Sequence, residues 1–176
     1  MPSGESGKVP LGDVRYRDPQ HVLAVYQNTI LTYSGDAPNP EYLDAWARTV
    51  EQLSTRFPAG LLVMTIIDRH TRAPDDHSRA RIRNTVLRHA DAIKALTYVV
   101  EGEGFGAAAI RSALSLISMA ARYPFPQKVF GYVEDAVPWL LSCSTHRAAE
   151  RAFDSTKLIE LARSLRSQLR GSAAAG

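Results

Sequence analysis

Apolar residues are distributed along the chain in two ways: short continuous runs, and longer segments in which they recur every three or four positions. The continuous runs lie at 22–26, 29–33, 60–68, 93–101 and 127–134. Their length and their content of valine, isoleucine and tyrosine predict β-strands, and the least polar of them predict strands buried on both faces. Gln27 and Asn28, between the first two runs, predict the turn of a β-hairpin.

The segments with helical periodicity alternate with the later strands. The first begins at Asn39, a predicted N-cap followed by Pro40, and a second begins near Asp75 or Asp76. A third helix is predicted to follow residue 105, and a short fourth to start within 134–141. The apolar faces of the first, third and last helices are predicted to be Leu43, Trp46, Val50, Leu53 and Phe57; Ile110, Ala113, Leu114, Ile117 and Ala121; and Leu158, Leu161, Leu165 and Leu169.

This order predicts an α/β fold. We expect a mostly parallel sheet of four to five strands that opens with a β-hairpin and is covered by helices, with an extra helix at the C-terminal end. The organisation that follows is a disordered segment at 1–19, one α/β domain at 20–142, a helical extension at 143–170 and a disordered tail at 171–176.

Length, charge and cysteine content indicate a single globular domain rather than a nucleic-acid-binding, disulfide-rich or membrane protein. The chain has 176 residues and a formal net charge of +3, which fits one globular domain and does not indicate a nucleic-acid-binding protein. A single cysteine, Cys143, leaves no internal disulfide and fits a reducing compartment. No apolar run reaches the length of a membrane span, and no secretion signal is recognisable near the start, so we expect a cytoplasmic protein.

Three stretches, "LAVYQNTILTYSG", "LLVMTIID" and "VFGYVEDAVPWLL", together resemble one known family. In element order and hydrophobic pattern, residues 21–141 resemble the STAS domain, the sulfate transporter and anti-sigma-factor antagonist domain, in its bacterial form related to Sec14-type lipid-binding proteins. The resemblance implies a regulatory or binding module rather than an enzyme. In that family a serine at the start of the second helix, within Asp-Ser-x-Gly, is phosphorylated. Here Asp68 ends the strand, but no Ser-x-Gly follows it, and Ser78 lies ten residues later.

The stretch "GEGFG" places Gly102, Gly104 and Gly106 between a predicted strand and a predicted helix. A dinucleotide-binding loop has the spacing G-x-G-x-x-G, so the third glycine here comes one residue early. Glu101 and Glu103 place negative charge where a phosphate would approach. We therefore expect a tight turn that allows the helix to pack on the sheet, and no cofactor.

Residues 69–89 are rich in arginine. Arg79 and Arg83 stand one helical turn apart, and Arg69 and Arg72 precede them in the loop. Guanidinium groups in this arrangement bind phosphate or an acidic partner, whereas the simpler interpretation is a solvated helix face. Together with the three glycines, these arginines are the predicted contact surface for a partner or an anion.

Other candidate chemistry has simpler interpretations. "DDH" at 75–77 has the pattern of a helix N-cap rather than of a zinc site. Cys143 and His146 lie three residues apart, but no third group that would orient the base is evident, so Cys143 is expected to be a small core residue.

Three functions follow from these observations. The leading hypothesis is a non-catalytic regulatory or signalling module that contacts another protein or a second copy of itself. The alternative is a small-ligand or lipid-binding domain with a pocket between helices and sheet. The third is an enzyme with a site near Asp68 and His70, at the carboxyl end of a strand.

Overall fold

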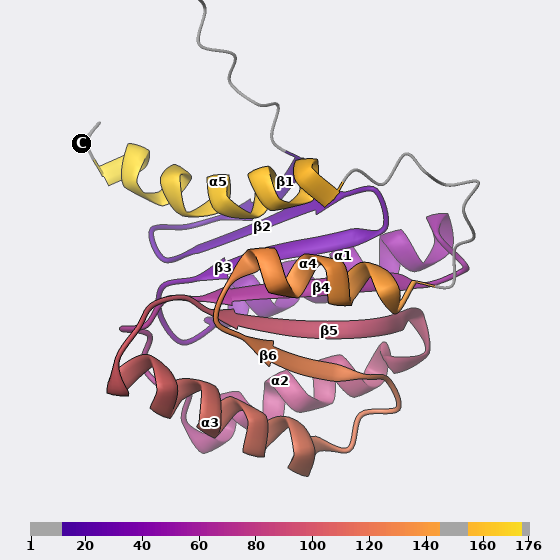
Figure 1. The fold of residues 1–176 in the computed structure, drawn as a ribbon. Helices are drawn as coiled ribbons and strands as arrows, with labels where there is room; N and C mark the ends of the chain where they lie inside the picture. The colour runs from indigo at the N-terminus through magenta and orange to yellow at the C-terminus, as the bar shows by residue number, and fades with distance from the viewer. Residues whose placement is uncertain (1–11, 145–154, 174–176) are drawn as a thin grey trace, which may run out of the picture.

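One six-stranded sheet forms the centre of the protein, as a computed structural model of the chain shows for residues 12–144 and 155–173 (Figure 1). The sheet has six strands, one more than the upper limit of the predicted four to five. The α/β class and the opening hairpin are confirmed. The strands are β1 (Asp13–Arg17), β2 (His21–Tyr26), β3 (Thr29–Ser34), β4 (Leu61–Ile67), β5 (Ile93–Val100) and β6 (Gln127–Phe130).

The strands lie in the sheet in the same order as in the chain. The first three are antiparallel, and β3, β4, β5 and β6 run parallel to one another. Gln27, with a positive φ of 53°, turns the hairpin between β2 and β3. The segments ending at Asp68 and Glu101 therefore lie side by side in one parallel arrangement, as predicted.

Strand β1 corrects the prediction that residues 1–19 are disordered. Asp13–Arg17 pairs antiparallel with β2, with an irregularity in register between Val14 and Tyr16. Most of its side chains are exposed, which explains the error, because an edge strand held by backbone hydrogen bonds carries no continuous apolar pattern. Residues 1–11 of the predicted disordered segment lie outside the described residues.

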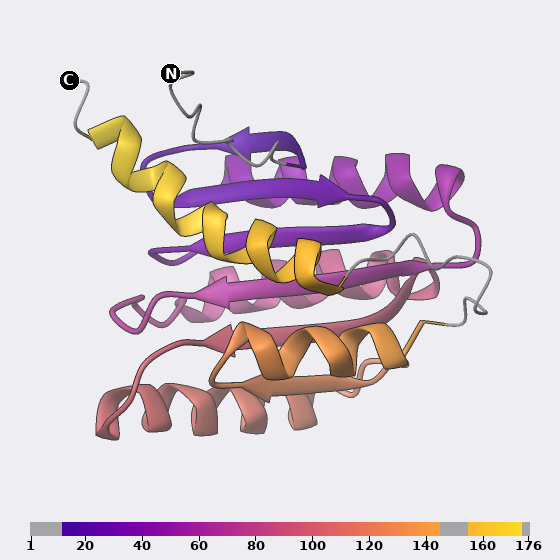
Figure 2. The same cartoon turned by 45° about the horizontal axis from the view of Figure 1, so that its top comes forward.

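Helices cover both faces of the sheet (Figures 1 and 2). Two of them, α4 and α5, lie on one face, while α1 and α2 lie on the other and α3 runs along the β6 edge. The helices are α1 (Pro40–Arg56), α2 (Asp76–Arg88), α3 (Phe105–Ala121), α4 (Val133–Ser142) and α5 (Ser155–Ala173), with a short 3-10 turn, η1 (Ala90–Ala92), before β5.

Local sequence signals explain where the helices begin. The side chain of Asn39 accepts a hydrogen bond from the backbone N–H of Tyr42 at 2.8 Å, and Pro40 opens α1. Asp75 caps α2 in the same way, accepting from the N–H of Ser78 at 2.7 Å. Both predicted N-caps are confirmed.

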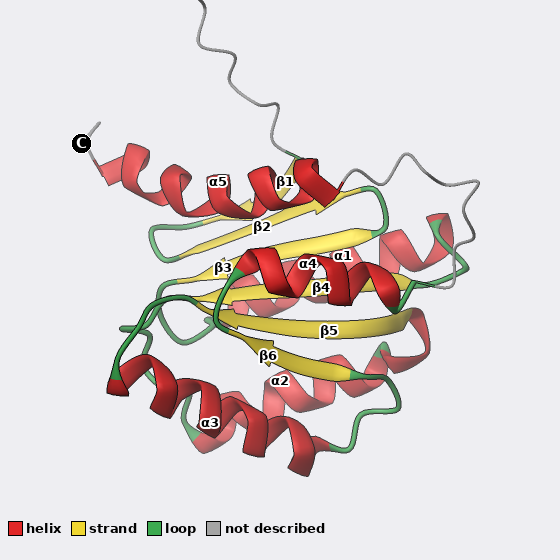
Figure 3. Cartoon of the chain, in the orientation of Figure 1, coloured by secondary structure: helices red, strands yellow, loops and turns green. Residues whose placement is uncertain are grey.

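The last strand and the C-terminal segment differ from the prediction in their limits. β6 ends at Phe130, and Val133 is already the first residue of α4 (Figure 3). The sequence pattern predicted that the strand continues through Val133. In the structure this fully buried valine is instead part of the apolar side of α4. Helix α5 continues to Ala173, so the predicted tail at 171–176 is helical in its first half, and 174–176 lie outside the described residues.

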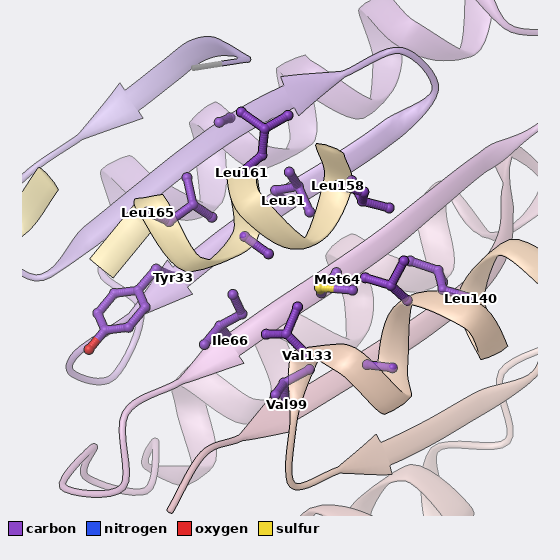
Figure 4. Close-up of a cluster of buried hydrophobic side chains, with 14 of the residues drawn as sticks. Leu31, Tyr33, Met64, Ile66, Val99, Val133, Leu140, Leu158, Leu161 and Leu165 are labelled. Atoms are coloured by element: carbon purple, nitrogen blue, oxygen red, sulfur yellow. The ribbon is translucent and has the colours of Figure 1, made fainter. Parts of the chain in front are cut away.

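The sheet face under α4 and α5 is closed by a continuous apolar core (Figure 4). Leu158, Leu161 and Leu165 of α5 project onto Leu31 and Tyr33 of β3 and are almost completely buried. On the other side of the same core, α4 contributes its own buried residues, Val133, Ala136, Val137 and Leu140. The predicted leucine stripe of the last helix is therefore buried against the chain's own sheet.

Ion pairs hold the polar side of α5 in the same position. Arg166 lies 3.4 Å from the carboxylate of Asp68 and 3.9 Å from that of Glu101, at the carboxyl ends of β4 and β5. Arg163 pairs with Glu134 at the start of α4. These pairs are partly exposed, so we expect them to fix the position of α5 rather than to supply most of its stability.

The buried stripe of α5 gives a testable expectation for stability. Replacing Leu161 by alanine removes a fully buried side chain and should lower the free energy of unfolding by about 2–5 kcal/mol. The substitution Glu160→Ala, at an exposed position of the same helix, should change it by less than about 0.5 kcal/mol. Chemical denaturation of both variants compares them, and equal midpoints would show that α5 is not docked.

Candidate functional site

The second face of the sheet is less completely covered. Helix α1 buries seven residues against it, among them Trp46 and Val50, whereas α2 buries only Val86. Helix α3 is apolar along most of its length but buries only Ala107 and Ala121. Helices α2 and α3 thus carry apolar side chains next to the sheet but bury few of them against it.

The space that results is an apolar cavity of about 500 Å³, bounded by the sheet, α1, α2 and α3. Val63 of β4 and Leu96 of β5 belong to its sheet wall. The α3 wall contains all five residues of the predicted apolar face, Ile110, Ala113, Leu114, Ile117 and Ala121. The helical periodicity therefore identified a surface that faces a cavity.

Charged groups stand around this apolar interior. The lining includes three arginines, Arg72, Arg79 and Arg83, and one acid, Asp36. Arg72 is bound to Asp36 through two hydrogen bonds, of 3.1 Å and 2.6 Å. The hydrogen bonds from Arg72 lower the pKa of Asp36 to about 2, so this carboxylate is ionised at neutral pH and already paired with Arg72.

The remaining two arginines lie on α2, one helical turn apart, and both are exposed side chains that form part of the cavity lining. Arg79 pairs with Asp76 and donates to the carbonyl oxygen of Pro74 at 3.0 Å. No hydrogen bond or ion pair joins Arg83 to any of the residues that the structure describes. The cavity thus has at its edge a guanidinium group available to a ligand.

Three tyrosines, Tyr42, Tyr98 and Tyr123, are among the uncharged polar residues of the cavity lining. The hydroxyls of Tyr98, on β5, and Tyr123, after α3, have no hydrogen-bond partner within the described ranges. Burial raises the pKa of both hydroxyls, and for Tyr123 the charge of Arg83 acts in the opposite direction. Both groups are therefore protonated donors at neutral pH.

A smaller and more polar pocket, of about 200 Å³, lies at the carboxyl ends of β3, β4 and β5. Asp68 is central to it, and accepts a hydrogen bond from the hydroxyl of Tyr33 at 2.8 Å. Burial raises the pKa of Asp68, but the hydrogen bonds from His70 N–H and Tyr33, together with the charge of Arg166, outweigh it and lower the pKa. The charged groups of this pocket already have partners, since Arg166 lies between Asp68 and Glu101.

The predicted contact surface is divided between these two sites. Arg72, Arg79 and Arg83 lie at the large cavity, whereas Arg69 and Gly102 line the small pocket. The two groups of residues do not line a common site.

The glycines of "GEGFG" form the predicted tight turn into α3. Gly102 has φ +117° and Gly104 has φ +93°, conformations that disfavour other residues, and Gly104 is the N-cap of α3. Gly106 lies in the first turn of α3 with open space around it, and neither Gly104 nor Gly106 lines either hollow.

The arrangement expected for an enzyme site at Asp68 and His70 is not formed. His70 binds Asp68 only through its backbone N–H, at 2.9 Å. Its exposed ring accepts a hydrogen bond from Arg69 at 3.0 Å and does not line the pocket. His146, the predicted neighbour of Cys143, lies outside the described residues, and Cys143 is partly buried against the core under α4 and α5.

Sequence reasoning did not identify Tyr98 and Tyr123 as site residues. Tyr98 lies within an apolar strand, and its alternation in β5 places it on the cavity side, but nothing in the sequence shows that the opposing helix stands away from it. Tyr123 stacks on Phe125 at 5.3 Å, next to the buried core on this side of the sheet.

No family model, curated protein or solved structure gives a significant match to this chain. The resemblance to the STAS domain therefore stays a prediction.

Over the described ranges, 12–144 and 155–173, two further searches gave negative results. No helix there is long and apolar enough to cross a membrane, and no group of histidine, cysteine and acidic side chains is arranged to hold a metal ion.

The loose contact of α2 with the sheet should be visible in hydrogen exchange. Because α2 buries one residue and α1 buries seven, backbone amides of 79–88 should exchange faster than those of 44–56. Hydrogen–deuterium exchange followed by mass spectrometry resolves the two segments. Equal protection would mean that α2 is held as firmly as α1 and that the cavity is not easily entered.

Proposed function

We propose that this protein is a binding module that holds a small apolar ligand between its sheet and helices α1, α2 and α3. The observation that carries the proposal is the apolar cavity of about 500 Å³ in a domain whose opposite sheet face is fully packed. The cavity is partly open to solvent, so apolar side chains of its lining expose surface to water unless a ligand covers them.

The cavity has the properties of a small-molecule site. Its volume lies within the range of roughly 300–1,000 Å³ that is usual for ligand pockets, and it corresponds to on the order of 15–20 non-hydrogen atoms. Its walls are apolar with a few polar groups, among them Thr65 and the three tyrosines. This composition binds a ligand through burial of apolar surface and orients it through few hydrogen bonds.

An entrance follows from the same packing. Helix α2 is connected to β4 by an exposed loop, and its only buried residue is Val86. A small outward displacement of α2 therefore breaks few contacts, and α2 is the element that we expect to move when a ligand enters.

A matched pair of substitutions on α3 tests the proposal. The uncharged dye Nile red should bind the wild-type protein and gain fluorescence, and Ala113→Phe should fill the cavity and weaken dye binding by about tenfold or more. Ala109→Phe is the control, since Ala109 is exposed on the same helix and does not line the cavity. An equal effect of both changes, or no dye binding to the wild type, would contradict a ligand site here.

A second candidate function, contact with another protein, is favoured by the outer side of α3. Phe105, Leu116 and Met119 lie on one stripe of this helix and are 91%, 67% and 76% exposed. The only charged residue of α3, Arg111, is turned back to the carbonyl oxygens of Val100 and Gly102, so the stripe carries no charge. An uncharged apolar stripe allows a second copy of the chain to approach without repulsion.

Self-association through this stripe can be measured directly. We expect the mass from light scattering to rise with protein concentration, and the double variant Phe105→Ser, Met119→Ser to remain at the mass of one chain. Val14→Ser, at an exposed apolar position on β1, should behave as the wild type. A wild-type protein that is monomeric at all concentrations would exclude a second copy as the partner while leaving dye binding in the cavity unaffected.

A further inference from the structure

Three residues of the cavity lining have polar groups without a partner among the described residues. Arg83, Tyr98 and Tyr123 line the same cavity, and none of them makes a side-chain hydrogen bond or ion pair within the described part of the chain. They come from three different elements: α2, β5 and the segment after α3. One arginine and two tyrosines from separate elements thus line one largely apolar space.

Electrostatic interactions link these three residues of the cavity lining. The charge of Arg83 acts on the hydroxyl of Tyr123, and Tyr123 in turn acts on that of Tyr98. The guanidinium is a donor only, and each of the two hydroxyls can donate one hydrogen bond. Such donors are the partners that an anionic oxygen group requires.

The net charge of the residues that line the cavity is positive, which also favours an anionic ligand. Three arginines and a single acid line it, and that acid, Asp36, is already occupied by Arg72. Arg79 is matched by Asp76, which leaves the charge of Arg83 uncompensated. A cationic ligand would be repelled by the Arg83 guanidinium, whereas an anionic ligand would neutralise it.

We infer that the ligand is an amphipathic anion, whose apolar chain lies under α2 and whose acidic head group is bound by Arg83 with the hydroxyls of Tyr98 and Tyr123. This inference rests on the ligand-binding function proposed above and specifies the class of ligand. Carboxylate and phosphate head groups share the required chemistry, since both present charged oxygen acceptors to a guanidinium group.

The test compares ligands that differ only in the head group. Dodecanoate, dodecyl phosphate and dodecan-1-ol, each below its micelle concentration, compete with Nile red for the wild-type protein. We expect at least one of the two anions to bind about tenfold or more tightly than the alcohol, because a charge-assisted hydrogen bond is stronger than a neutral one. The better of the two anions identifies the head group as carboxylate or phosphate.

Substitution of Arg83 tests whether its guanidinium group causes the preference for the anion over the alcohol. Arg83→Gln should weaken the preferred anion about tenfold and leave dodecan-1-ol within about twofold of its wild-type affinity. Arg88→Gln is the matched control, because Arg88 is exposed on the same helix and does not line the cavity. Tyr98→Phe, which removes one hydroxyl and keeps the ring, should also weaken the anion selectively.

The outcomes separate the two proposals. Dye binding together with equal affinities for the anions and the alcohol, or an anion preference that Arg83→Gln leaves intact, would overturn the inference and keep the ligand-binding function. A wild-type protein that binds neither dye nor competitor would overturn both.

Discussion

Closure of one sheet face by α4 and α5 is the interaction on which the rest of this structure depends. The leucines of α5 and the buried side of α4 form an apolar core with β3, β4 and β5. Because α4 and α5 bury this face of the sheet, the domain has a substantial apolar core without full coverage of the other face. An incompletely filled space under α2 is therefore compatible with a stable domain.

The sequence predicted the elements of the fold more accurately than their limits. Strong periodic signals gave the hairpin at 22–33, the buried strand before Asp68 and the leucine stripe of α5, since each depends on which side of an element meets a core. Strand β1 was missed because its pairing is by backbone hydrogen bonds at a polar edge. The end of β6 was misplaced because a buried valine fits either a strand or the first turn of a helix.

The candidate site was predictable only in part, and the reason is geometric. Periodicity reports the direction in which a helix turns its apolar side, but not its distance from the sheet. The apolar face of α3 from Ile110 to Ala121 was therefore correctly identified while the cavity it faces was not. For the same reason the basic segment was read as one surface, whereas Arg69 belongs to the pocket on the side of α5 and Arg83 to the cavity on the side of α2.

The order of the strands also determines how the chain can be built during synthesis. Each strand from β2 onward pairs with the one made just before it, so the sheet grows outward one strand at a time from the hairpin. Helix α5 is the exception, since it is made last and returns to the first-made strands, β2 and β3, with Arg166 reaching Asp68 across 98 positions of chain. The side of the hairpin that carries Val22, Ala24 and Leu31 therefore cannot be buried by α5 until the end of the chain has been made.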